Sequence, residues 1–141
     1  MNIHAGHSIP SGDPERFLLL EYKWLDSERN IQSKHSEEIG QKWSWNPKAK
    51  KESDNRLLPG EVREITIKSP ETTGIKYLTI EIYHVRLREE IMEYMKKSSK
   101  SLDNVLKGKI QNIEHLYPGK TLVYQLEYDL QTKNILEKSP F

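Results

Sequence analysis

The chain has 141 residues, 30% of them charged, and its formal net charge at pH 7 is +1. A chain so close to neutral has no field that would attract nucleic acid or an anionic membrane surface. It contains no cysteine, which excludes disulfides, cysteine zinc ligands, thiolate catalysis and haem attachment through Cys-x-x-Cys-His.

Residues 1–16 are rich in Gly and Pro and carry two histidines, His4 and His7. Such a composition fits neither a helix nor a central strand, so we expect a loop of defined shape. A shaped loop that presents imidazoles beside a strand is typical of a ligand site. The alternative interpretation is a structured turn whose histidines are merely exposed.

Residues 17–25 alternate with a period of two, which predicts a half-buried strand. Its apolar face would carry Leu18, Leu20, Tyr22 and Trp24, and its other face Glu21 and Lys23. A short, polar second strand is predicted over 31–39. Aromatic alternation continues over 40–47 until Pro47 ends it, and 48–58 resemble an irregular connection with a solvated basic run.

The second half of the chain begins with the turn signal Pro59-Gly60. It leads into 61–68, where Ile65 and Ile67 face one way, and 76–87 form the best predicted strand. Helical spacing follows over 88–97 and 101–107, with Ser99 or Ser101 as the cap of the second helix. A last long strand would place four side chains on one face, Leu122, Tyr124, Leu126 and Tyr128, before 130–135 turn back.

Turn signals separate short strands that do not alternate regularly with helices, which indicates an antiparallel sandwich. We therefore predict a mostly β fold, an immunoglobulin-like antiparallel β-sandwich with a short helical insertion at about 88–110. The histidine loop at 1–16 would precede a single β-sandwich domain at 17–141. The N-terminus lacks the basic segment and apolar run of a signal peptide. Since the chain starts so close to the loop, a piece of a longer protein is one interpretation.

Other candidate sites are less specific. His4, His7 and Asp13 could supply three metal ligands, but no strong motif completes them. Trp43 and Trp45 could form a carbohydrate-stacking platform, or they could cap the edge of the core. His84 lies inside a strand, where a core histidine is the default. No Gly-x-Ser-x-Gly or phosphate-binding loop is present, so we do not expect an enzyme.

The segment Ala5-Gly6-His7-Ser8-Ile9-Pro10-Ser11-Gly12, followed by an apolar strand, resembles an element of multihaem c-type cytochromes. In that family a Gly-His-x-x-Pro-Thr/Ser-Gly segment opens a C-terminal β-sandwich domain. Similar stretches are Ile39-Gly40-Gln41-Lys42-Trp43-Ser44-Trp45, 53–61 and 78–87.

The resemblance implies that the chain is a non-haem domain or subunit of a multihaem cytochrome c electron-transfer system. His7 would be the distal axial ligand of a haem iron, and His4 is a second candidate. Because the chain lacks Cys-x-x-Cys-His, haem c would be carried by another segment or chain, its partner. The resemblance also implies a periplasmic or extracellular setting. The alternative function is a stand-alone extracellular β-sandwich module, in which Trp43, Trp45 and Tyr83 meet a carbohydrate or a protein.

Overall fold

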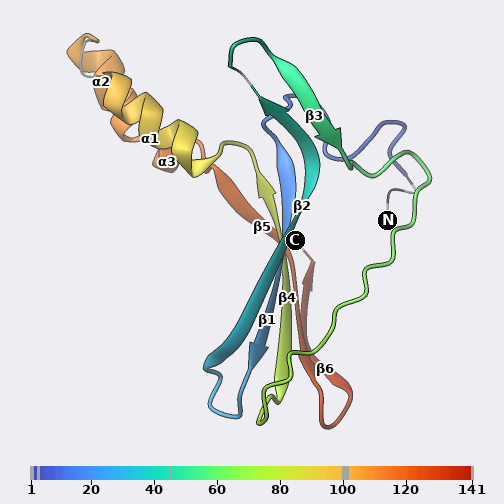
Figure 1. Ribbon diagram of the computed structural model, residues 1–141. Helices are drawn as coiled ribbons and strands as arrows, with labels where there is room; N and C mark the ends of the chain where they lie inside the picture. Colours follow the sequence, from blue (N-terminus) through green and yellow to red (C-terminus); the bar gives the residue numbers. More distant parts are fainter. Residues whose placement is uncertain (1, 3, 45, 100–101, 141) are drawn as a thin grey trace.

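The computed structural model describes residues 2, 4–44, 46–99 and 102–140. In this part of the chain six antiparallel strands form one sheet with the order β3-β2-β1-β4-β5-β6 (Figure 1). The elements are β1 (Phe17–Leu25), β2 (Ile31–Ser44), β3 (Lys50–Asp54), β4 (Tyr77–Val85), α1 (Glu89–Ser98), α2 (Asn104–Gln111), α3 (Ile113–Leu116), β5 (Lys120–Asp129) and β6 (Asn134–Pro140). The prediction of a mostly β, antiparallel fold with a short helical insertion is confirmed.

One face of the sheet, which we call the apolar face, carries the core. Along β1, Leu20, Tyr22 and Trp24 are buried, and each lies opposite an apolar residue of β4. Directly opposite residues of an antiparallel pair share a face, so the alternation in sequence becomes a continuous apolar surface. The alternation predicted for 17–25 therefore places the largest core cluster as expected, while Phe17 and Leu25 are buried on the other face.

A second layer of extended chain covers the apolar face and makes the architecture sandwich-like. Within this layer, residues 62–69 will be called the strap (Figure 1). Ile65 and Ile67 of the strap pack against the core of the sheet. The 61–68 segment thus has the predicted facing of its isoleucines, but it does not enter the sheet.

The opposite face, which we call the charged face, carries ion pairs. The Glu21 carboxylate lies 3.0 Å from the ammonium groups of both Lys34 and Lys120. Lys23 contacts Glu81 at 2.5 Å. Among the described residues, no helix or strand packs across this face.

The helices between β4 and β5 pack on one another and project away from the sheet (Figure 1). They end at Leu116, a few residues beyond the predicted insertion. The sequence predicts Ser99 or Ser101 as the cap of the second helix. The structure instead places Asp103 there, whose carboxylate accepts hydrogen bonds from Val105 and Leu106; Ser101 lies outside the described residues.

No helix in the described chain is long and apolar enough to cross a membrane.

Two further details differ from the sequence expectations. Residues 50–54, predicted as an irregular connection, form the edge strand β3 against the end of β2. In β5 the register shifts, so that Tyr124 lies opposite Ile82 while Leu122 lies opposite Tyr83. Because this bulge at Val123 inserts one residue, Leu122 lies on the charged face instead of sharing a face with Tyr124.

Candidate functional site

The N-terminal histidine loop is held against the second layer by Asn2. This side chain is 1% exposed, and its amide Nδ2 donates to the carbonyls of His7 at 2.8 Å and Leu57 at 3.1 Å. The Asn2 backbone N–H donates to Glu61, and its carbonyl accepts from Gly60. A single buried residue thus fixes both sides of the loop.

The loop is also held at Ile9 and at Asp13. Ile9 and Leu57 exchange two backbone hydrogen bonds of 2.9 Å. The Asp13 carboxylate accepts from the Glu15 N–H at 2.9 Å, and the positive φ of +88° at Gly12 favours glycine before this turn. These contacts give the loop a defined shape up to the start of β1.

His4 and His7 are both exposed. The Nδ1 atom of His7 lies 3.1 Å from the carbonyl oxygen of Ser8. Because a carbonyl only accepts hydrogen bonds, this contact places a proton on Nδ1, and in the neutral ring it leaves the lone pair on Nε2. A Cβ at the neighbouring Gly6 would meet no atom within 4 Å. In this tautomer the Nε2 atom of His7 is the one that could ligate a metal, next to an open surface.

The alternative metal site at His4, His7 and Asp13 has no support from this geometry. Within the described ranges of the chain, no three His, Asp or Glu side chains lie together so that they could hold a metal ion. The Asp13 carboxylate is used in its own turn.

The remaining histidines of the sheet lie at the apolar face. His84 is half-buried in β4, and burial, with the nearby Arg86 and Arg16, lowers its pKa. The His35 ring is stacked on Tyr22, with ring centroids 6.0 Å apart. Both positions fit structural histidines better than ligands.

Of the predicted aromatic platform, Trp45 lies outside the described residues. Trp43 lines a polar depression of about 300 Å³ together with Glu38 and Arg88, which form an ion pair of 3.0 Å. Tyr83 does not line this depression. Its hydroxyl donates to Glu81 at 2.7 Å, and the Lys120 ammonium lies 3.8 Å from its ring centroid. Its pKa is raised by burial and by this hydrogen bond to a carboxylate.

Sequence reasoning missed a pocket of about 330 Å³ between β1, β2 and the strap. Tyr22 and Trp24 of β1 line it from the sheet, and Ile67 and Lys68 line it from the strap. The only signal for it in the sequence is the alternation of Ile65 and Ile67, which predicts a segment facing the sheet without saying where it lies.

The fold is similar to that of a solved structure, a penta-heme cytochrome c552 from Thermochromatium tepidum. The TM-score is 0.64, the sequence identity is 20%, and 88% of this chain is covered. The match spans 33% of the cytochrome chain, so most of that protein lies outside it. No protein-family model and no curated protein sequence matches this chain. The likeness is therefore one of fold, shared over nearly the whole of this chain.

Proposed function

We propose that this chain is the non-haem part of a multihaem cytochrome c electron-transfer system and packs on its haem-bearing region. The observation that carries the proposal is the fold shared over 88% of the chain with one third of a penta-heme cytochrome.

The haem c of this system would be held by another segment or chain. Covalent attachment of haem c requires cysteine thiols, and this chain has none. The role that we propose for this chain is support of the haem-bearing region. Because haem c is attached outside the cytoplasm, the proposed setting is periplasmic or extracellular.

His7 is the residue that we propose as a distal axial ligand of one haem iron in this region. A neutral imidazole coordinates iron through one ring nitrogen while the other donates to a carbonyl or carboxylate. The Nδ1 contact with Ser8 supplies this second interaction within the chain itself. The anchoring of the loop by Asn2 would keep the imidazole in place without help from the partner.

His4 is the second candidate for this role. It is exposed on the same loop, but no hydrogen bond within the described residues orients its ring. A ligand that must hold one orientation gains from such a bond, so His7 is favoured over His4.

The first test is the mass and visible absorption of the protein purified from its natural source. We expect a mass well above 16.6 kDa, or a copurifying haem protein, together with a strong Soret band. A colourless protein of 16.6 kDa that copurifies with no haem protein would refute the electron-transfer function.

The second test concerns the axial ligand and uses the assembled cytochrome. In the His7→Ala variant, one haem is expected to change from low spin to high spin in the electron paramagnetic resonance spectrum. His4→Ala, on the same loop, is the matched control and should leave the spectrum unchanged. A low-spin spectrum in both variants would exclude ligation by this loop while leaving the packing role intact.

A further inference from the structure

The strap, residues 62–69, is an extended segment whose backbone has no hydrogen-bond partner in the described part of the chain. Its side chains alternate between exposed and half-buried positions, as in a strand with one face on a core. Within the described residues, no backbone N–H or C=O of the strap makes a hydrogen bond. Strands with unpaired backbone groups are templates for another strand.

The second layer starts as a paired structure and loses its pairing at the strap. Asn2 bonds to both Gly60 and Glu61, and Ile9 bonds to Leu57. Beyond Glu61 the next backbone bond is the one that Lys76 donates to Leu25, at the end of β1. The strap therefore crosses the apolar face as a single strand. It is held by the packing of Ile65 and Ile67 and by the Arg63 guanidinium, which donates to the Asn55 carbonyl at 2.7 Å.

The pocket of about 330 Å³ lies beside this unpaired strand, over β2. Tyr22 lines the pocket, is 2% exposed, and has a buried hydroxyl without a hydrogen-bond partner among the described residues. A buried hydroxyl left unpaired costs about 1–3 kcal/mol. The hydroxyl oxygen has almost no exposed surface, so the side chains that cover it must move before a group in the pocket can bond to it and recover that cost.

We propose that an extended segment of a partner polypeptide adds as a strand beside the strap, over β2, and thereby widens the second layer of the sandwich. Its backbone would pair with the strap, and one of its inward side chains would enter the pocket and bond to the Tyr22 hydroxyl. Main-chain pairing supplies affinity in this mode of recognition, and the pocket supplies specificity.

The pocket also defines the chemistry of that side chain. Glu37, Lys34 and Lys68 line it, and the Lys34 ammonium is paired with Glu21. A basic side chain would therefore meet two like charges and an acidic one would meet Glu37. Trp24 and Ile67 line it as well and favour a small residue with an apolar part. The best fit is a neutral hydrogen-bonding side chain such as threonine. Strand addition at this edge needs no haem, and it stands apart from ligation by His7.

The test uses capped synthetic octapeptides of alternating valine and threonine, with threonine at the inward positions in one set and valine in the other. Binding is followed by amide hydrogen exchange of the strap and by the change in tryptophan fluorescence, to which Trp24 at the pocket contributes. We expect the strap amides to exchange rapidly in the free protein and slowly with the threonine peptide.

Two backbone-methylated versions of that peptide form the matched control, with methyl groups on alternate amides. In a strand pair only every second N–H points to the partner strand. One methylated peptide should therefore lose binding and the other should keep it. Equal binding of both, or strap amides that are protected without peptide, would overturn the proposal.

The Tyr22→Phe variant tests the pocket separately. The protein should prefer the threonine peptide over the valine peptide by about threefold to tenfold, the worth of one hydrogen bond. Tyr22→Phe is expected to abolish this preference while strand pairing persists. A preference unchanged in the variant would refute the role of the hydroxyl, and absence of binding by every peptide would refute the docking site itself.

Discussion

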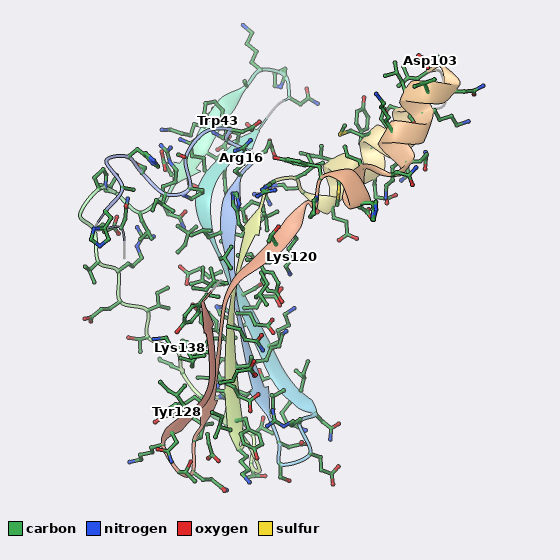
Figure 2. The ribbon with its side chains drawn as sticks, turned by 180° about the vertical axis from the view of Figure 1, so that it is seen from behind. Arg16, Trp43, Asp103, Lys120, Tyr128 and Lys138 are labelled. Carbon is green, nitrogen blue, oxygen red and sulfur yellow. The ribbon has the colours of Figure 1, made fainter. Side chains whose placement is uncertain are left out.

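Neighbouring residues of β1 show how differently the two faces of the sheet are stabilised. Leu20 is 6% exposed under the second layer, whereas the next residue, Glu21, points to the other side and is held between two lysines. The apolar face gains stability from the removal of hydrocarbon from water. The charged face gains it from paired charges, whose lysines include Lys120 on β5 (Figure 2). The side chains of Lys34 and Lys120 stay 48% and 43% exposed.

This difference explains why one layer of irregular chain suffices to complete the fold. Glu21 lies directly opposite Glu81, which by itself would destabilise the pairing of β1 and β4. Lys23, Lys34 and Lys120 surround these two carboxylates and compensate them. A face satisfied in this way can remain beside water, while the apolar face needs the strap.

The largest effect is expected from a comparison of two leucines that follow one another. Leu20→Ala should reduce the free energy of unfolding by about 2–5 kcal/mol, because it leaves a cavity in the core. Leu19→Ala, on the charged face, should cost roughly half of that or less, since Leu19 is only half-buried. Urea denaturation measures both, and equal losses would contradict the assignment of the core to one face.

A medium effect is expected when the charges are disrupted. Glu21→Gln should cost about 1–2 kcal/mol, since it removes the partner of Lys34 and Lys120, and the loss should shrink at high salt. Glu52→Gln breaks an exposed pair with Lys50 and should have almost no effect. A loss at Glu21 that salt does not alter would point to packing instead of charge.

The stability of the charged face should also depend on pH. Burial tends to raise the pKa of Glu21, but hydrogen bonds from Lys34 and Lys120 outweigh it, so the pKa lies below its ordinary value of 4.5. The resulting stabilisation is complete above pH 4.5 and is lost as the pH falls toward the folded-state value. Denaturation at a series of pH values should show a shallower acid loss in Glu21→Gln. An identical acid loss would refute the lowered pKa.

The smallest effect separates two tyrosines on opposite faces. Tyr83→Phe removes a hydroxyl that donates to Glu81 and should cost about 1 kcal/mol. Tyr22→Phe removes a hydroxyl that has no hydrogen-bond partner among the described residues, and it should leave the stability unchanged or slightly higher. Thermal unfolding compares them directly. A clear loss in Tyr22→Phe would mean that its hydroxyl already has a partner in solution.

Much of the sheet was predictable because apolar and polar side chains that alternate along a strand lie on its two opposite faces. The period of two in 17–25 correctly separates Leu20 and Tyr22 from Glu21 and Lys23. The same reasoning failed in β5, because a bulge changes the facing of Leu122 without any mark in the hydrophobic pattern. The short edge strand β3 was missed because its side chains are all exposed and show no alternation of apolar residues.

The candidate site was predicted only in its residue types. Gly and Pro around His7 indicate a shaped loop, and the loop is indeed held by several hydrogen bonds. The anchor, Asn2, carries no sequence signal, since its role depends on Leu57, a residue far along the chain. The ring proton of His7 likewise depends on where the Ser8 carbonyl points.

By itself the sequence determined which segments are extended, which side chains share a face, and that no haem can be attached covalently to this chain. These properties are local, or follow from composition alone. Only the tertiary structure decided which strands are neighbours, that Glu21 is compensated by lysines of β2 and β5, and that the strap lies unpaired across the core. Strand pairing joins residues far apart in the chain. The local pattern that makes a segment extended does not specify which other strand it pairs with.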